Sequence, residues 1–512
     1  MRLFTLFSLL LTSLTATAQD PAKSDLAPCG APPALTPWLR AYQDRPQDFA
    51  AAERSQDTLY AAMQVHLLAR DNGTGRFSAE RLLDAFCRLN SDFGPSRIRF
   101  YFKNDWNLID STGWWQHPDI PQGIDMMLAN NVPGALNSYF ASDVAGNCGY
   151  NLPYGGVAVA HSCANASDHT WAHEVGHALS LPHPFIGWEG KTYSTVNPTP
   201  DTLTYDYTYF HDSLETQIPA PLDTALVEYL NGSNCSIAAD RVCDTKADYL
   251  SYRWDCNGQS QSLAQQFDPN GAGFFSDGTL YLSYAADNCQ NRFSDEQISI
   301  MRANLQSEKI EWLSPGPPQG NITQAPQLLS PTGGQLSPSV GTQLTWSSVP
   351  NATHYLVQAS RFATYIVKEI DLVTTDTSAV LNGPLLNNQT FYWRVRPFNY
   401  WTTCAGFTPS ATFKATTATS TSSPDADGWQ YYPTLLAPEQ PVTLRIPETW
   451  LDNTARCQVY DAAGRLVWET EQWLGHTQIS LDLPSGNWSA GIYRLVFRHE
   501  KGVKVGSLSL VR

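Results

Sequence analysis

The sequence contains no cluster of basic residues and no apolar run long enough to span a bilayer. Among its 512 residues, 32 are Lys or Arg and 48 are Asp or Glu, which gives a formal net charge of −16 at pH 7. Proteins bind nucleic acids and anionic membranes through clustered cations, so this composition excludes both partners. A membrane-spanning helix needs about 18 or more apolar residues, and the mostly apolar stretch at residues 3–11 is too short. We expect no transmembrane segment.

The first residues instead have the pattern of a cleaved secretory signal. Arg2 precedes the apolar stretch, and the small residues Ala16 and Ala18 follow it, as at signal-peptidase sites. Export leads to an oxidising environment, in which ten cysteines favour disulfides, although their pairing does not follow from the sequence. We predict a signal peptide at residues 1–18, a short propeptide or N-terminal extension at 19–57, and a secreted or cell-surface location.

Strand and helix patterns alternate from about residue 58 to residue 315. Strand-like runs at 63–68 and 98–102 enclose a helix that Ser78 caps, and a strand at 155–160 precedes a histidine motif. This order predicts a mixed, twisted α/β sheet with the motif beside a sheet edge at 155–160. A last helix is expected to begin with a capping box at Ser294. Its expected buried stripe consists of Ile298, Met301 and Leu305.

Two all-β modules are expected after this α/β domain. Short alternating strands at 325–415 and again at 429–512 are typical of β-sandwiches. We interpret 316–324 and 416–428 as linkers, because the first is rich in proline and the second has almost no apolar residue to bury. A chain of this length is also too long for one hydrophobic core.

The residues with the clearest chemistry lie between His173 and His183. His173 and His177 are four residues apart, so on a helix both imidazoles project from one face and can share a metal ion. His183 lies six residues further on, which requires a sharp turn after the helix. Three neutral imidazoles leave a fourth position open, as in catalytic zinc sites, and Glu174 is placed to act as the general base.

Chance, a structural zinc site and a degenerate peptidase are the alternatives to a catalytic zinc site at this motif. A chance match is rare, because on the order of one such sequence in a hundred would contain the first two histidines and the glutamate, and far fewer the third histidine. A structural zinc site usually has four protein ligands and favours cysteine. A degenerate peptidase would keep the ligands without the activity.

At these residues the chain resembles the metzincin clan of zinc peptidases, whose histidine motif is followed by a Met-turn. Its context is similar to the pappalysin or cytophagalysin family of that clan, over about half of the chain. The matching features follow in order: Leu89-Asn90 with Asp92-Phe93, Cys235, the stretch from Asp240 to Thr245, Ser283-Tyr284 with Asp287 and Cys289, and Phe293-Ser294 with Gln297.

The resemblance implies that the three histidines bind one Zn²⁺ and that Glu174 activates water. It also implies that Tyr284 donates a hydrogen bond to the tetrahedral oxyanion; the alternative is a core tyrosine in a turn. The strand at 157–160 would be the edge on which an extended substrate adds, although sheet packing explains its residues equally well.

Two positions depart from the family pattern. Ser180 replaces the glycine that turns the chain toward the third histidine, at a cost of roughly 1 kcal/mol if it is left-handed. Leu282 replaces the methionine of the Met-turn, a swap that usually costs less than about 1.5 kcal/mol. Neither position is a ligand or the base, so they bear on full activity rather than on zinc binding.

The cysteines and an acidic stretch give further expectations. We expect Cys29 to take part in a disulfide; the alternative is a latency thiolate at the open zinc position. Cys235, Cys243, Cys256 and Cys289 are expected to form two disulfides. Asp240, Asp244 and Thr245 match a stretch that helps to bind calcium in relatives, which makes Ca²⁺ a second candidate ion, but a solvated acidic loop explains them equally well.

The two β modules have resemblances of their own. Residues 325–415 resemble bacterial fibronectin type III-like modules. Residues 429–512 resemble the C-terminal sorting domain of the type IX secretion system, through Tyr432-Pro433, the turn at 461–465 and the strand at 491–493. This implies the outer-membrane secretion machinery as a partner.

The features together favour a secreted zinc metalloendopeptidase that hydrolyses peptide bonds in protein or peptide substrates. The alternative function is a weak or inactive zinc-binding surface protein that acts through its β-sandwich as a binding module.

Overall fold

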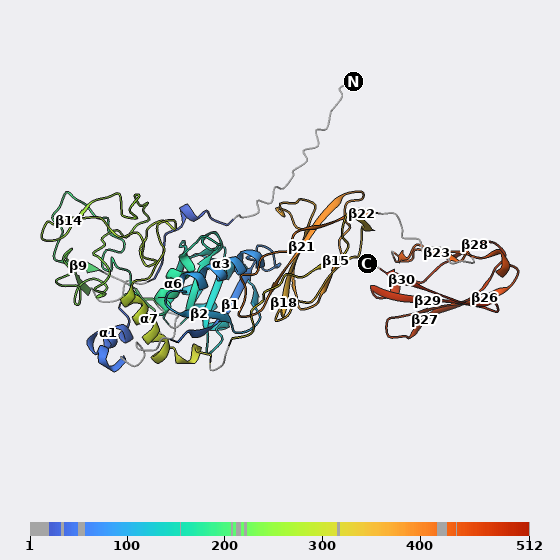
Figure 1. Ribbon diagram of the computed structural model, residues 1–512, viewed down its shortest axis with the longest axis horizontal. Coiled ribbons are helices and arrows are strands. Elements are labelled where there is room, and N and C mark those ends of the chain that lie inside the picture. Colours follow the sequence, from blue (N-terminus) through green and yellow to red (C-terminus); the bar gives the residue numbers. More distant parts are fainter. Residues whose placement is uncertain are drawn as a thin grey trace, which may run out of the picture. The chain divides into compact units, whose positions relative to one another are not determined.

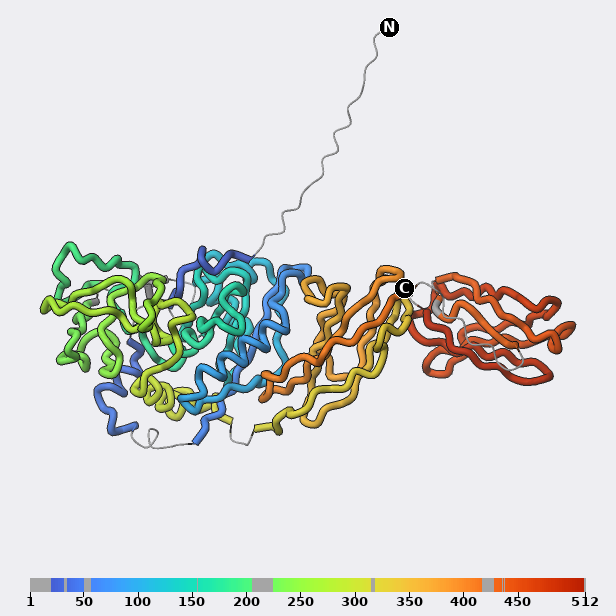
Figure 2. Tube along the Cα trace, turned by 45° about the horizontal axis from the view of Figure 1, so that its top comes forward, coloured from blue at the N-terminus to red at the C-terminus, as the bar shows by residue number. Residues whose placement is uncertain are grey.

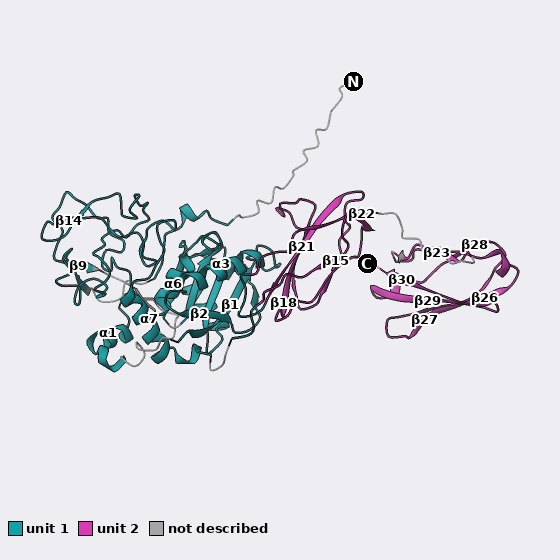
Figure 3. Cartoon of the chain, in the orientation of Figure 1, with its two compact units in different colours: residues 1–321, 399–404 teal, residues 322–398, 405–512 magenta. Residues whose placement is uncertain are grey.

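The computed structural model describes residues 20–31, 35–49, 57–153, 155–205, 208–210, 217–219, 223–314, 318–416, 428–436 and 438–510. The predicted signal peptide lies outside them. The chain divides into two compact units (Figure 3): unit 1 comprises Met1–Asn321 with Asn399–Cys404, and unit 2 comprises Ile322–Phe398 with Ala405–Arg512. None of the described helices is both long enough and apolar enough to cross a membrane.

Unit 1 is built on a six-stranded mixed sheet with the order β2-β1-β5-β8-β7, in which β3 also pairs with β1 (Figure 1). All neighbouring strands are parallel except β7, which runs antiparallel to β8. The strands are β1 (Leu59–Ala69), β2 (Ile98–Phe102), β3 (Asn107–Asp110), β5 (Leu136–Ala141), β7 (Gly149–Leu152) and β8 (Gly156–Ala160). The predicted mixed α/β region is therefore confirmed.

Side chains cap the starts of all α-helices of unit 1 that the structure describes except α6. Ser78 caps α3 by accepting a hydrogen bond from the amide of Arg81. At the start of α7, Ser294 and Gln297 form the predicted capping box. The buried stripe of α7 differs from the prediction, since Ile300 rather than Ile298 is fully buried. The α-helices are α1 (Pro37–Asp44), α3 (Ala79–Asp92), α4 (Thr112–Trp115), α5 (Ile120–Asn130), α6 (Thr170–Ala178) and α7 (Asp295–Ser307).

The predicted sheet edge was wrong. β8, at the predicted position, lies between β5 and β7, and β7 is the edge strand. Asn151 of β7 pairs with Val157 of β8, so the edge of β8 is already occupied. The short strand β7 follows a turn. All four of its residues are buried, so its sequence lacks the alternation of polar and apolar residues that would predict a strand.

The described residues within 184–290, the loop region, have little regular structure (green in Figure 1). Their described strands are β9 (Thr202–Tyr205), β10 (Thr208–Phe210), β11 (Gln217–Pro219), β12 (Asp223–Leu226), β13 (Gln266–Phe267) and β14 (Gly273–Phe274). The other short elements of unit 1 are η1 (Lys23–Asp25), η2 (Pro46–Phe49), β4 (Gln116–His117), β6 (Asp143–Val144), η3 (His161–Cys163) and η4 (Ile310–Trp312).

Four disulfides lie within unit 1. Two of them join Cys235 to Cys243 and Cys256 to Cys289, which confirms the two bridges expected among these cysteines. The other two are Cys87–Cys404 and Cys148–Cys163. The expected disulfide of Cys29 is wrong, because its thiol is free.

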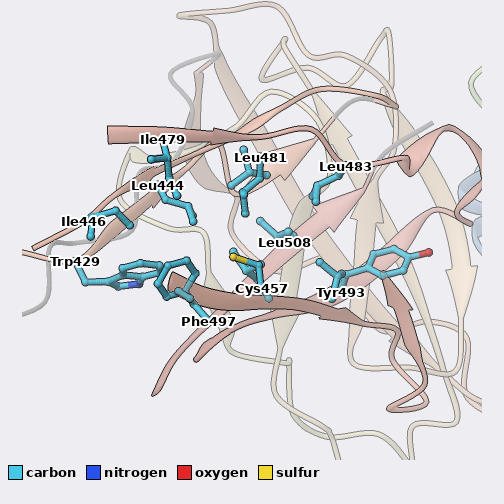
Figure 4. Close-up of a cluster of buried hydrophobic side chains, with 14 of the residues drawn as sticks. Trp429, Leu444, Ile446, Cys457, Ile479, Leu481, Leu483, Tyr493, Phe497 and Leu508 are labelled. Carbon is cyan, nitrogen blue, oxygen red and sulfur yellow. The ribbon is translucent and has the colours of Figure 1, made fainter. Parts of the chain in front are cut away.

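The described residues of unit 2 form only β-structure apart from two 3-10 turns, and their strands form two bodies of two sheets each. The first has sheets β15-β17-β20 and β16-β22-β21-β18-β19, and the second has sheets β23-β25-β28 and β24-β30-β29-β26-β27. In the second body, Trp429, Phe497 and the free Cys457 pack in one apolar core (Figure 4). The expected all-β region is confirmed, whereas the exact domain limits stay predictions.

The elements of the first body are β15 (Leu328–Ser330), β16 (Gln335–Pro338), β17 (Thr342–Trp346), β18 (His354–Ser360), β19 (Ile370–Thr374), β20 (Ser378–Leu381), β21 (Thr390–Phe398) and β22 (Ala411–Thr416). Those of the second are β23 (Gln430–Tyr432), β24 (Leu435–Leu436), β25 (Val442–Arg445), η5 (Glu448–Trp450), β26 (Thr454–Tyr460), β27 (Leu466–Trp473), β28 (Gln478–Leu481), η6 (Ser485–Asn487), β29 (Gly491–His499) and β30 (Gly502–Leu510).

Candidate metal centre

The three motif histidines converge at one point beside α6. The Nε2 atoms of His173, His177 and His183 lie 3.0, 3.1 and 3.2 Å from one another. Four-coordinate zinc with bonds of about 2.0 Å to nitrogen separates its ligand atoms by about 3.3 Å. The spacing of the three nitrogens therefore suits a small tetrahedral cation.

The other ring nitrogen of each histidine is held by a hydrogen-bond acceptor. Nδ1 of His173 lies 2.7 Å from the carbonyl oxygen of Tyr281, and Nδ1 of His177 lies 2.7 Å from that of Leu181. Nδ1 of His183 lies 3.1 Å from Oε1 of Glu189. Each Nδ1 can therefore donate its hydrogen outward, which leaves the lone pair of each Nε2 directed at the common centre.

Burial makes this centre unsuitable for protons but suitable for a metal. Burial lowers the pKa of all three imidazoles, and that of His183 falls to about 3. Three neutral rings with facing lone pairs repel one another unless a cation lies between them. With Sγ of Cys29, their ligand atoms all lie within 4.8 Å of one another, so this His/Cys group could bind a metal ion.

Glu174 lies beside the histidines and is fully buried. Its Oε1 has no hydrogen-bond partner among the described residues, and its Oε2 lies 3.6 Å from Sγ of Cys29. Burial raises its pKa well above the ordinary range, a property of carboxyl groups that exchange protons near neutral pH. Gly149 of β7 makes room for it, because a Cβ there would lie 2.7 Å from Cγ of Glu174.

The two unusual support positions are as the sequence indicated. Ser180 has a left-handed φ of 71°, and its hydroxyl accepts a hydrogen bond of 3.1 Å from Nδ2 of Asn304. Leu282 is fully buried beneath α6, where its Cδ2 lies 3.0 Å from the position of a Cβ on Gly176. A polar anchor thus offsets the strain at Ser180, and Gly176 accommodates the leucine.

Tyr284 lies next to the metal-binding group. Its ring centroid is 5.0 Å from that of His183 and 5.9 Å from that of His173. Its hydroxyl donates a 3.4 Å hydrogen bond to the carbonyl oxygen of Cys29, and burial raises its pKa well above the ordinary range. The hydroxyl therefore stays protonated and is available as a donor.

Residues 20–31, the N-terminal strap, lie along the open side of the centre; Figure 2 shows them at the dark-blue start of the described chain. The amide of Ala27 donates to the carbonyl of Gly146, and the carbonyl of Ala27 accepts from Cys148. The amide of Gly30 donates to the carbonyl of Gly149 at the edge strand β7. The strap thereby places Cys29 against the three histidines.

The strap is also held by an ion pair and a contact to a histidine, both further from the centre. The ammonium of Lys23 bridges Asp168, just before α6, and Asp287, with 2.7 Å to the second carboxylate. Asp20 lies 3.3 Å from Nδ1 of the buried His161. Both contacts fix the segment before Cys29 on unit 1.

The structure adds a residue that the sequence reasoning missed, Glu189. Its Oε1 contacts His183, while its Oε2 accepts a 2.7 Å hydrogen bond from the amide of Gly187. The other two histidines donate to neutral carbonyls, so only the third has a carboxylate partner. Glu189 follows His183 by six residues in the sequence, but no spacing rule for loops predicts that these two side chains meet.

A second acidic group lies in the loop region. Glu228 and Asp240 are almost fully buried, and neither forms an ion pair with a residue that the structure describes. Thr245 contacts Asp240, but Asp244 instead accepts hydrogen bonds from Ser294 and Glu296 at the start of α7. Of the three residues predicted for calcium, the structure thus brings together two and adds Glu228.

The buried carboxylates of this group lie in a setting that disfavours their charged forms. Burial raises the pKa of Glu228 to about 8, and its Oε2 has no hydrogen-bond partner among the described residues. Burial and the nearby charge of Glu228 raise the pKa of Asp240 well above its ordinary range. Oxygen ligands of this kind suit a hard divalent cation such as Ca²⁺.

No protein family and no curated protein matches the chain. A mutant of promirolysin from Tannerella forsythia is 16% identical, with a TM-score of 0.37, over 56% of this chain and 96% of that one. These values are too low to establish a common fold.

The β modules also have remote structural neighbours. The FN1–FN3 domains of chicken CNTN1 are 12% identical, with a TM-score of 0.16, over 38% of this chain and 68% of that one. The sixth fibronectin type III domain of human fibronectin type III domain containing protein 3 is 17% identical, with a TM-score of 0.16, over 22% of this chain and 97% of that one.

Proposed function

We propose that this protein is a secreted zinc-dependent endopeptidase of the metzincin type. The observation that carries the proposal is the convergence of three Nε2 atoms at 3.0–3.2 Å beside a buried glutamate. His173, His177 and His183 would hold one Zn²⁺. When bound, the ion would polarise a peptide carbonyl and lower the pKa of a water molecule beside Glu174.

The residues around the centre have distinct tasks in this reaction. Glu174, with its raised pKa, accepts a proton from the attacking water and returns it to the leaving amine. Tyr284 donates a hydrogen bond to the oxygen that becomes negative. The edge of β7, rather than β8, receives the main chain of an extended substrate, because its outer side now holds the strap.

The Glu174→Ala variant tests the proposal directly. Because the Cys29 thiol belongs to the same potential ligand set, the comparison uses protein with Cys29→Ala. We expect it to cleave a broad protein substrate at least about 100-fold faster with Glu174 than with Ala at this position, with one zinc per chain in both by elemental analysis. Equal cleavage by both proteins would contradict a peptidase and would leave the zinc-binding surface protein as the better interpretation.

We further propose that the strap keeps the enzyme latent. Sγ of Cys29 joins the three histidines in one potential ligand set, and the thiol is not used in a disulfide. Full-length protein should therefore gain activity when Cys29 is replaced by Ala. Cys29 should also react with a thiol reagent faster once a chelator has removed zinc. A wild-type protein as active as the Cys29→Ala variant would contradict latency.

Two proposals concern the rest of the chain. We propose that Glu228, Asp240 and Thr245 bind a structural Ca²⁺, which would neutralise the buried carboxylates.

We also propose that residues 429–512 direct export through the type IX machinery, in agreement with the disulfides expected of an extracellular protein. The turn at 461–465 is well formed, since Oδ1 of Asp461 accepts from the amides of Ala463 and Arg465. Deletion of residues 429–512 should retain the protein inside the cell.

A further inference from the structure

Arg253 lies beside the proposed substrate path along β7 and forms no ion pair with a residue that the structure describes. Its side chain is exposed, and its one contact in the described part of the chain is a 3.4 Å hydrogen bond from Nη2 to Sγ of Cys148. Cys148 is bonded to Cys163, and sulfur is a weak acceptor. The guanidinium therefore has most of its five donors free.

The backbone around Arg253 is fixed from two sides. The amide of Trp254 donates to the carbonyl of Tyr284, and the amide of Ala286 donates to the carbonyl of Trp254. The disulfide between Cys256 and Cys289 holds the same two segments together. The cation is thus attached to the segment that carries Tyr284, so little backbone freedom is lost when it binds a ligand.

The position of Arg253 faces the path of the strap. The amide of Cys148, its contact residue, donates a 2.7 Å hydrogen bond to the carbonyl of Ala27. The next residue, Gly149, packs against Glu174. Ala27 has no side-chain acceptor, so the strap leaves the guanidinium unpaired while it occupies this path.

We propose that Arg253 forms a subsite for a carboxylate of the substrate. This inference rests on the proposed function, because the substrate is taken to replace the strap along β7. Ala27 precedes Cys29 by two positions, so we expect the carboxylate about two residues from the scissile bond. The carboxylate comes from an Asp or Glu side chain or from a free C-terminus, since a guanidinium binds both in the same way.

The test measures peptide binding, so it does not depend on turnover. The zinc-loaded full-length protein with Glu174→Ala and Cys29→Ala is titrated with C-terminally amidated decapeptides. Each peptide has one Glu among otherwise uncharged residues, and the position of this Glu differs from peptide to peptide. Each peptide has a twin with Gln at the same position, and a further twin has a free C-terminal carboxylate. We expect one Glu position to bind about fivefold more tightly than its Gln twin, the usual effect of an exposed ion pair, and less so at high salt.

Variants of the arginine identify the source of the preference. Arg253→Ala should abolish the preference for Glu, Arg253→Lys should keep part of it, and Arg253→Glu should reverse it in favour of Lys. Arg445→Ala, at an exposed arginine of unit 2, is the matched control and should change nothing. A gain confined to the free-acid peptides would support the subsite and assign it to a chain terminus.

The outcomes separate this inference from the proposed function. Equal binding of all Glu and Gln twins without a gain for the free-acid peptides, or a preference that survives Arg253→Ala, would overturn the carboxylate subsite. If the preference follows Arg253 but protein with Glu174 restored cleaves no peptide, the subsite is supported and the peptidase proposal is wrong. If peptides are cleaved without any such preference, the peptidase proposal stands alone.

Discussion

The two sides of the metal centre are built by different physical means. On one side, α6 packs against β7 and β8 of the sheet and places His173, His177 and Glu174 through regular hydrogen bonds. On the other side, the loop region places Glu189 and the segment leading to Tyr284 through disulfides, isolated hydrogen bonds and buried carboxylates. A helix sets its side chains by local geometry, whereas a loop of this length needs cross-links. The loop side should therefore respond more to redox conditions, calcium and pH.

The largest effect that would sharpen this contrast is expected at the Cys256–Cys289 disulfide, which closes 33 residues of sequence. Replacing both cysteines by Ser should destabilise unit 1 by about 3.7 kcal/mol in the chain-entropy description. Because this bridge holds the segment that carries Tyr284, peptide cleavage should fall further than zinc content. Chemical unfolding, zinc analysis and cleavage rates measure the three effects.

The Cys148–Cys163 bridge on the sheet side is the matched control. It closes 15 residues, for which the same description gives about 3.0 kcal/mol. Its loss should lower stability to a similar extent but affect turnover less, since β7 and β8 retain their hydrogen-bonded pairing. If both double variants lost zinc and activity together, the two sides would not be independent.

The next effect concerns Glu228 and pH. Burial raises its pKa from 4.5 to about 8, so the folded protein binds a proton in this interval that the unfolded chain has lost. Without calcium, the stability that this proton supports is present below about pH 4.5 and is lost as the pH rises toward 8. We expect the Tm in EGTA to fall across this interval by at least about 2–4 °C, the shift that follows from about 1 kcal/mol.

Calcium and the Glu228→Gln variant should each change this pH dependence. Added Ca²⁺ would hold the carboxylates ionised and raise the Tm most at the alkaline end. The Gln variant cannot ionise, so its Tm in EGTA should depend less on pH and should respond little to calcium. A pH profile identical to that of the wild type would show that the pKa of Glu228 is the same in the folded and the unfolded state.

A smaller effect is expected when Glu189 is changed to Gln, which keeps the shape of the side chain but removes the carboxylate charge beside His183. Carboxylate partners of metal-binding histidines usually contribute about 10- to 100-fold to affinity, and we expect about tenfold weaker zinc binding in competition with a chelator. Glu311→Gln, at an exposed position, is the control. Unchanged affinity would mean that the hydrogen bond alone, which Gln can still accept, holds the ring.

The sequence predicted the sheet side of the centre much better than the loop side. His173, Glu174 and His177 follow a helical spacing, and Ser294 indicates the start of its helix by a local capping rule. The surroundings of Glu189, Glu228 and Arg253 depend on contacts within loops. Loops have no sequence periodicity from which such contacts could be predicted. The position of β7 and the free thiol of Cys29 were likewise missed, because strand order and pairing of cysteines are decided by the whole fold.

The smallest effect is expected at Ser180, where the chain leaves the helix side and turns toward the third histidine. Its left-handed φ of 71° costs roughly 1 kcal/mol, which glycine would relieve. Glycine would also remove the hydroxyl that accepts from the buried Asn304, at a cost of about 0.5–1.5 kcal/mol. Because the two terms nearly cancel, Ser180→Gly should change the free energy of unfolding by less than about 0.5 kcal/mol, whereas Ser180→Ala should lose about 1 kcal/mol. Urea unfolding of both variants measures the difference, and a Gly variant clearly more stable than the wild type would show that the strain outweighs the hydrogen bond.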